Sequence, residues 1–277
     1  MIPEPRLVET ARGVLAVREW SNGAGIPLVF CHALGPCASG GELVEVAPQL
    51  VAAGYAPVSV DGPGFGASPL AEPESYSLAV LAELLRATIS ALELERPVLM
   101  GHSWGGGIVT TLAGMHPQET RALVLIDSGH IDYADIVEGR TAPDPITWEW
   151  ESREAFRAWL SENLDRVTQE VLDGYEAGVR DEDGKVVGAA AEASRRARAG
   201  LLDLLSPHWP HLEHVPVLLF LATELPHRDQ NRQHIGKFAA AVPHADIRWV
   251  DGASHGLIAD VGPPLGDEIA AWLDVYR

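Results

Sequence analysis

Short apolar runs alternate with segments of helical periodicity along most of this chain. The runs are rich in β-branched and aliphatic residues and end at turn-forming residues, a pattern typical of buried strands. We predict strands at residues 7–10, 14–20, 27–31, 56–60, 98–100, 122–126, 215–221 and 246–250. Apolar residues spaced three or four apart predict helices at 41–53, 75–94, 106–115, 230–241 and 261–276. This alternation favours a mostly parallel sheet covered by helices on both faces.

The alternation stops between residues 128 and 214. That segment is rich in aromatic residues and has helical spacing at 153–164, 168–177 and 189–205, with a turn at 183–184. We therefore predict a core domain made of residues 1–127 and 215–277, and a helical cap at 128–214 inserted after the sixth strand.

Composition narrows the classes of partner. The chain has 277 residues, 47% of them hydrophobic, which suits one large domain of ordinary core content. Its 20 Lys and Arg against 39 Asp and Glu give a formal net charge of −19, which disfavours nucleic acid and anionic membranes as partners. We expect a small-molecule substrate and no metal or cofactor. The composition does not indicate the oligomeric state.

Localisation is predicted from three sequence features. The first residues have neither the basic nor the apolar stretch of a signal peptide, and no apolar run approaches the length of a membrane span. Only two cysteines occur, Cys31 and Cys37, which is consistent with a reducing compartment. We expect a cytoplasmic protein.

A nucleophile motif joins the strand at 98–100 to the helix that follows it. Gly101-His-Ser-Trp-Gly105 has the G-x-S-x-G pattern, in which a sharp turn exposes the serine hydroxyl and small residues let strand and helix approach. The helix N-terminus behind the serine offers backbone N–H groups to a developing oxyanion. Ser103 is therefore the candidate nucleophile.

Together with three further motifs, this turn resembles the α/β-hydrolase superfamily. The matching motifs, in the family's order, are His32-Ala-Leu-Gly35, Asp61-Gly-Pro-Gly-Phe-Gly-Ala-Ser68, Gly101-His-Ser-Trp-Gly105 and Gly252-Ala-Ser-His255. The resemblance implies an α/β-hydrolase fold with an eight-stranded, mostly parallel sheet. It also implies an oxyanion hole made by the backbone N–H groups of Leu34 and Trp104. The family usually has glycine at the position of Ala33, so the loop is expected to follow a slightly different path.

The resemblance and the strand order also indicate the other two members of a catalytic triad. His255 follows the last strand, at the sheet edge where ligands bind, and is the candidate general base. We choose Asp127 as the acid because it ends the sixth strand, which lies beside the nucleophile strand in the resembling fold. Glu224 is the alternative acid, one residue away from the family's usual position after the seventh strand.

We predict that the substrate pocket is lined by His32, Trp148, Trp150 and Trp209, with His32 as a hydrogen-bonding residue rather than a catalyst. The leading hypothesis is a serine hydrolase that cleaves a carboxylic ester or lactone of a small, largely apolar substrate. A carbon–carbon bond hydrolase and a prolyl-type aminopeptidase share the same motifs, and cap acids such as Glu149, Glu151 and Glu154 would serve the aminopeptidase. The alternative of another class is a non-catalytic protein that binds a small ligand.

Overall fold

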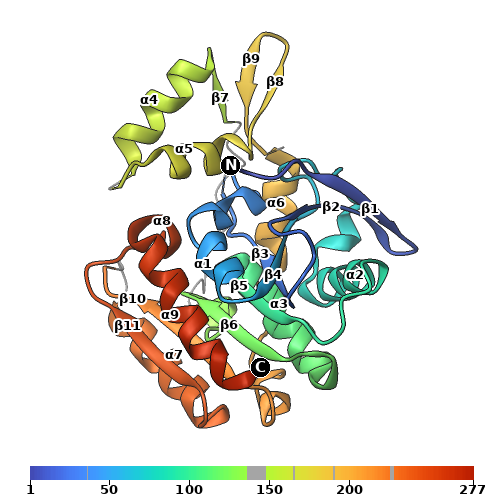
Figure 1. Ribbon diagram of the computed structural model, residues 1–277, viewed down its shortest axis with the longest axis vertical. Coiled ribbons are helices and arrows are strands. Elements are labelled where there is room, and N and C mark those ends of the chain that lie inside the picture. Colours follow the sequence, from blue (N-terminus) through green and yellow to red (C-terminus); the bar gives the residue numbers. More distant parts are fainter. Residues whose placement is uncertain (36, 136–147, 165, 190, 225–227) are drawn as a thin grey trace.

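An eight-stranded sheet forms the centre of the protein (Figure 1). The computed structural model describes residues 1–35, 37–135, 148–164, 166–189, 191–224 and 228–277. The strands are, in chain order, β1 (Arg6–Thr10), β2 (Gly13–Glu19), β3 (Ile26–Cys31), β4 (Tyr55–Asp61), β5 (Val98–His102), β6 (Ala122–Ile126), β10 (Val217–Ala222) and β11 (Asp246–Val250). Their order across the sheet is β1-β2-β4-β3-β5-β6-β10-β11, and β2 pairs antiparallel with both β1 and β4 while the other neighbours are parallel. The predicted fold class is confirmed.

Each face of the sheet carries its own apolar layer. Leu99 of β5 packs in one cluster, with α2 (Leu78–Ala91) and α3 (Trp104–Met115), and Val98 and Met100 pack in the other. The second cluster holds the helices α1 (Ala47–Ala52), α8 (Leu257–Val261) and α9 (Pro263–Leu273). The remaining helix of the core, α7 (Arg228–Ala241), contributes Phe238 to the first cluster. This period-two division is what a sheet buried on both faces requires.

Two predicted helices are interrupted. The segment predicted at 41–53 divides into the 3₁₀ helix η1 (Gly40–Glu45), capped by the Ser39 side chain, and α1, which begins at a proline-containing first turn. The segment at 261–276 is cut at Gly262, which has φ of 64° and precedes two prolines. A positive φ cannot continue a right-handed helix, so α8 and α9 are separate.

The segment between β6 and β10 is mixed in structure. Its helices are α4 (Arg153–Asn163), α5 (Gln169–Glu176) and α6 (Ala191–Gly200), and its short strands β7 (Glu149–Trp150), β8 (Arg180–Glu182) and β9 (Lys185–Val187) form a second sheet. Asp183 and Gly184, with φ of 50° and 80°, make the two-residue turn between β8 and β9. The three strands were not predicted.

This segment also divides in its packing. Trp150, Phe156 and Val186 form a separate apolar cluster under α4 and the short strands, in the upper lobe of Figure 1. The apolar side chains of α6 and of the 3₁₀ helix η5 (Trp209–Leu212) instead join the core cluster of α2 and α3. The described part of the segment at 128–214 therefore packs in two places, and the cap with those bounds stays a prediction.

Contacts from α5 and from the residues just before it hold this layer to the core. A Cβ on Gly41 of η1 would lie 2.7 Å from the carbonyl oxygen of Gly174 in α5, so only glycine allows the two backbones to approach this closely. Arg166 forms an ion pair with the buried Glu45 and donates to the carbonyl oxygen of Ala259 at 2.8 Å. These contacts fix α5 above the carboxyl edge of the sheet.

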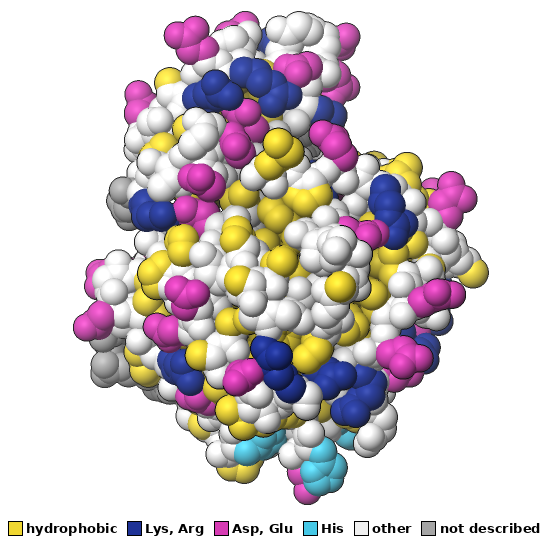
Figure 2. All heavy atoms as spheres, viewed as in Figure 1, with side chains coloured by type: hydrophobic (Ala, Val, Ile, Leu, Met, Phe, Trp, Pro, Cys, Tyr) yellow, Lys and Arg dark blue, Asp and Glu magenta, His cyan; other side chains and the backbone are white. Residues whose placement is uncertain are grey.

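Surface charge is dispersed on the face that Figure 2 shows. Acidic side chains are scattered there with Lys and Arg among them, so the net charge of −19 is not gathered into one acidic patch on that face. Among the described residues, no helix is both long enough and apolar enough to span a bilayer.

Candidate active site

Ser103 sits on a strained turn between β5 and α3. Its φ of 51° and ψ of −116° are rare for a residue with a side chain, and cost on the order of 1–3 kcal/mol. Glycines make the turn possible: a Cβ on Gly101 would lie 2.5 Å from the carbonyl oxygen of Gly105, and one on Gly105 would lie 2.1 Å from that of Cys31. The motif thus lets α3 start directly against the sheet, with Ser103 at the turn.

The three residues predicted as a triad lie in one hydrogen-bonded chain. The Oγ of Ser103 is 2.8 Å from Nε2 of His255, and Nδ1 of His255 is 2.6 Å from Oδ2 of Asp127. Since a carboxylate only accepts, Nδ1 carries the imidazole hydrogen and Nε2 is free to accept the serine proton. The geometry is that of a nucleophile, a base and an orienting acid.

The carboxylate of Asp127 is held in place by burial and by a backbone hydrogen bond. It follows β6, its side chain is 3% exposed, and Oδ1 accepts a hydrogen bond from the N–H of Ala222 at 3.1 Å. Its φ of 46° is a second strained position. The alternative acid, Glu224, is exposed, and its backbone N–H donates to Ala253 at 3.0 Å. The acid that the structure brings to His255 is therefore Asp127.

The predicted oxyanion donors lie at the start of α3 and in the loop after β3. Within the described part of the chain, the N–H groups of Leu34 and Trp104 have no hydrogen-bond acceptor. The neighbouring N–H groups are occupied: Gly105 donates to His32 at 3.1 Å, and Ala33 donates to Oε2 of Glu42 at 2.9 Å. Ala33 has no positive φ, so the loop does not need the glycine that the family usually has there.

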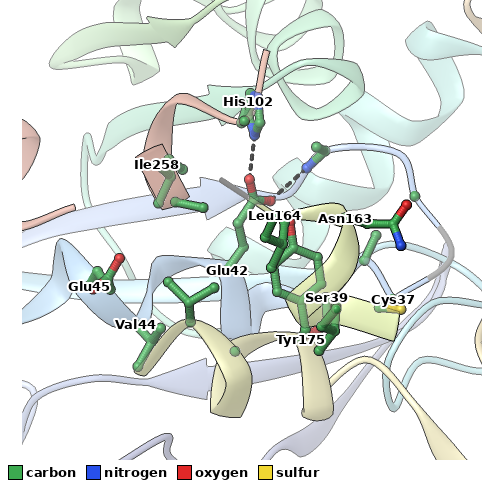
Figure 3. Close-up of a pocket in the computed structure, with 18 of the residues that line it drawn as sticks. Cys37, Ser39, Glu42, Val44, Glu45, His102, Asn163, Leu164, Tyr175 and Ile258 are labelled. Carbon is green, nitrogen blue, oxygen red and sulfur yellow. Dashed lines mark hydrogen bonds and ion pairs between the residues drawn. The ribbon is translucent and has the colours of Figure 1, made fainter. Parts of the chain in front are cut away.

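An apolar cavity of about 290 Å³ lies beside His255 and the oxyanion loop, between η1, α4, α5 and α8 (Figure 3). Its walls are mostly aliphatic and aromatic. They include Leu34, Val44, Trp159, Leu164, Val171, Tyr175 and Ile258, with Glu42 and His102 as the polar pair at one end. Space of this size and character suits a small, largely apolar ligand.

The four residues predicted to line the substrate pocket do not line this cavity. His32 is buried against Phe65 and Trp104, and its Nε2 accepts from the N–H of Gly62 at 2.9 Å. Burial lowers the pKa of His32, so its ring is neutral and holds the loop in place.

The tryptophans are packing residues. Trp150 lies edge-on against Phe156, and Trp148 stacks on Trp150, inside the cap layer. Trp209 donates from Nε1 to the carbonyl oxygen of Gly129 at 2.9 Å and packs against the core. Of the tryptophans in the described residues, Trp159 is the one that lines the cavity.

Sequence reasoning also missed the pair formed by Glu42 and His102. His102 directly precedes the nucleophile, and its side chain lines the cavity and bonds Oε1 of Glu42 through Nδ1. Burial alone lowers the pKa of His102, but the Glu42 carboxylate outweighs it, so this pKa is raised. Burial likewise opposes ionisation of Glu42, but His102 outweighs it and the pKa of Glu42 is lowered.

Cys37 lines the same cavity and is not a rival nucleophile. Burial raises the pKa of its thiol to about 12, which leaves it protonated at neutral pH. Across the residues that the structure describes, no group of three His, Cys, Asp or Glu side chains is arranged to hold a metal ion.

Comparisons with known proteins agree with the geometry. A model of the alpha/beta hydrolase fold matches residues 26–181, more than half of the chain. A putative non-heme haloperoxidase of Mycobacterium phage D29 is 32% identical over 155 residues, which cover 56% of this chain and 51% of that protein. A 2-hydroxymuconate semialdehyde hydrolase of Pseudomonas sp. (strain CF600) is 33% identical over 121 residues, 44% of this chain and 42% of that protein. The chain thus spans about half the length of these curated relatives.

A solved structure resembles the chain over nearly its whole length. The crystal structure of E-2-(acetamidomethylene)succinate hydrolase superposes with a TM-score of 0.82, covering 99% of this chain and 100% of that one, at 22% identity. At this level of identity, the likeness speaks for the fold alone.

Proposed function

This chain belongs to the α/β-hydrolase family, and on that premise we propose that it is a serine hydrolase that cleaves a carboxylic ester or lactone of a small, largely apolar substrate. The observation that carries the proposal is the hydrogen-bonded chain from Ser103 through His255 to Asp127, beside an apolar cavity. A serine in this place, rather than an aspartate, argues against the epoxide hydrolase and dehalogenase chemistries that the same fold supports.

In the first half of the reaction, Ser103 Oγ attacks the carbonyl carbon while Nε2 of His255 takes its proton. The carbonyl oxygen becomes an oxyanion and receives hydrogen bonds from the N–H groups of Leu34 and Trp104. The tetrahedral intermediate then collapses, the bond to the alcohol oxygen breaks, and His255 returns the proton to that oxygen. Asp127 keeps the imidazole in the required tautomer and stabilises its positive form.

In the second half, water takes the place of the alcohol. His255 removes a proton from the water, the resulting hydroxyl attacks the acyl-enzyme, and collapse releases the acid and returns the proton to Ser103. In a lactone the alcohol and acid belong to one molecule, so ring opening leaves both on the acyl-enzyme until this step.

The cavity limits the substrate. Its volume of about 290 Å³ lies near the lower end of the roughly 300–1,000 Å³ typical of small-molecule pockets, which favours a small substrate. The described residues that line it include the Glu42 carboxylate and neither Lys nor Arg, which favours an uncharged group over an anionic one. We therefore expect short neutral esters and lactones to be the better substrates.

A carbon–carbon bond hydrolase is the second candidate, favoured by the likeness to the 2-hydroxymuconate semialdehyde hydrolase. The aminopeptidase is less favoured. Two of the cap acids that would hold a substrate amine, Glu149 and Glu151, contact Lys185 at the surface, and the described lining of the cavity does not include them.

The test is a substrate panel with a nucleophile variant. Aryl esters of two to eight acyl carbons, five- and six-membered lactones and a vinylogous 1,5-diketone acid are offered to the wild-type protein and to Ser103→Ala. We expect turnover of esters or lactones in the wild type and a fall on the order of 10⁶-fold in kcat for Ser103→Ala. Turnover of the diketone alone would favour the carbon–carbon hydrolase, and binding without turnover of any compound would leave a non-catalytic binding protein.

A further inference from the structure

We propose that Glu42 and His102 act together as positioning residues that hold the oxyanion loop against the loop of the catalytic histidine. The inference rests on the proposed function, because it assumes that the N–H groups of Leu34 and Trp104 stabilise an oxyanion. Neither residue belongs to the triad, and neither contributes an oxyanion donor.

The pair connects the two loops through hydrogen bonds on both sides. On one side, Oε2 of Glu42 accepts the N–H of Ala33, the residue directly before the donor Leu34, at 2.9 Å. On the other side, Nε2 of His102 is 2.7 Å from the backbone oxygen of His255. Oε1 of Glu42 and Nδ1 of His102 close the connection between them (Figure 3). A displacement of either loop therefore stretches the pair.

The partners of His102 determine where its hydrogens lie. A carbonyl oxygen only accepts, so Nε2 must carry a hydrogen to bond His255. Glu42 raises the pKa of His102 and His102 lowers the pKa of Glu42, so each residue favours the charged form of the other, with Nδ1 donating to Oε1. The His102 side chain is 4% exposed and the Glu42 side chain 23%, so water competes weakly for these bonds.

Position matters here because an oxyanion donor acts over a narrow range of geometry. Removing one such donor costs about 10²–10³ in kcat, and a donor turned away from the oxyanion loses part of that contribution. The imidazole ring of His255 lies 5.1 Å from that of His102, centroid to centroid, so the same contact also supports the loop that carries the base. The pair thus sets the distance between the oxyanion hole and the base.

The chain offers a pair of substitutions that separates hydrogen bonding from charge. In Glu42→Gln, the amide oxygen still accepts from Ala33 and the amide nitrogen donates to Nδ1 of His102, so every hydrogen bond survives in a neutral form. In Glu42→Leu, both bonds of residue 42 are lost and the Ala33 N–H is left without its acceptor. A positioning role predicts a large effect of Leu and a small effect of Gln.

A matched control lies away from the site. Glu83 and His116 form another Glu–His pair, with 2.6 Å between Oε1 and Nε2 and side chains that are 17% and 24% exposed. Glu83→Leu removes a pair of the same chemistry without touching the cavity or its loops. Because Glu83 also forms ion pairs with Arg12 at 3.3 Å and Arg86 at 4.0 Å, this variant reports an upper limit for the cost of losing such a pair to stability.

The experiment measures kcat and KM with the best ester, together with the rate at which a fluorophosphonate modifies Ser103. We expect kcat and the modification rate of Glu42→Leu to fall at least about tenfold with KM within about threefold, because the interaction is strongest in the transition state. Glu42→Gln should stay within about threefold of wild type, and Glu83→Leu should lower the melting temperature without changing kcat. The double variant Glu42→Leu/His102→Leu should be no worse than the single one, since the two residues act as a unit.

The outcomes separate this inference from the proposed function. If the wild type is modified at Ser103 and a folded Glu42→Leu is modified equally fast, the pair does not position the site and the inference is wrong, while the nucleophile stands. If Glu42→Leu does not fold, His102→Leu breaks the same connection from the other side and must show the same loss of kcat. Lack of wild-type modification at Ser103 would overturn the proposed function and this inference with it.

Discussion

Replacing Asp127 by asparagine tests how the site prepares His255 for catalysis. The substitution keeps the size of the side chain, and asparagine tolerates the positive φ of 46° at this position as well as aspartate does. The N–H of Ala222 donates to Oδ1 at 3.1 Å, so the asparagine oxygen must take that place. Its NH₂ group then faces Nδ1 of His255, across the 2.6 Å that now separates the carboxylate from the ring.

The expected loss of kcat follows from this exchange of a carboxylate oxygen for an NH₂ group. An NH₂ group donates, so Nδ1 of His255 must accept and the imidazole hydrogen moves to Nε2, which lies 2.8 Å from Ser103 Oγ. In that tautomer the base cannot take the serine proton. We expect kcat to fall on the order of 10⁴-fold, or about 5.5 kcal/mol at ~1.36 kcal/mol per decade, with KM nearly unchanged.

The assay is steady-state hydrolysis of an aryl ester by Asp127→Asn, with thermal melting to show that the fold is intact. Glu224→Gln is the matched control, because it makes the same chemical change in the exposed alternative acid and should leave kcat within about threefold. A folded Asp127→Asn that keeps a tenth or more of wild-type kcat would refute the assignment, as would a comparable fall in Glu224→Gln.

Two further predictions concern packing and pH. Trp209→Ala should lower stability by roughly 3–5 kcal/mol without altering substrate preference, since its ring packs in the core, whereas Trp159→Ala should shift the preferred acyl length in the ester panel. The stability difference between wild type and Glu42→Gln should be greatest between about pH 4.5 and 6.5, the unshifted pKa values of Glu42 and His102. It should shrink as pH rises through the raised pKa of His102 or falls through the lowered pKa of Glu42, and denaturant unfolding across pH measures it.

The order of the elements could be predicted because each core strand and helix carries its own periodic signal. The choice of Asp127 over Glu224 came from the resemblance to the α/β-hydrolase superfamily, which implies that the sixth strand lies beside the nucleophile strand. In the structure β6 does lie next to β5, and Asp127 directly follows β6. The first inference depends on local pattern, which the amino-acid sequence expresses directly, and the second on the strand order that the resemblance implies. They identify the candidate nucleophile, base and acid.

The pocket could not be predicted in the same way. Aromatic content shows that rings such as Trp150 and Trp209 are buried, but tertiary packing decides whether a buried ring faces a cavity or a core. The strands β7, β8 and β9 are two or three residues long, too short for an alternating pattern to be visible.

The pair of Glu42 and His102 joins positions 60 residues apart. The nearest hint in the fold is the register of β3 and β5, which pairs Cys31 with Gly101 and so brings the oxyanion loop beside His102. No local pattern connects Glu42 with either strand.

The central claim is that Ser103 attacks the substrate and becomes acylated. Rapid acid quench of the protein with an aryl ester, followed by peptide mass spectrometry, tests it directly. The account predicts an acyl group on the Ser103 peptide of the wild type within the first turnover and none in Ser103→Ala. In Asp127→Asn more acyl-enzyme should accumulate if loss of the Asp127 carboxylate slows deacylation more than acylation. Turnover of the ester by Ser103→Ala at the wild-type rate, with no acyl group on the wild-type peptide, would contradict it.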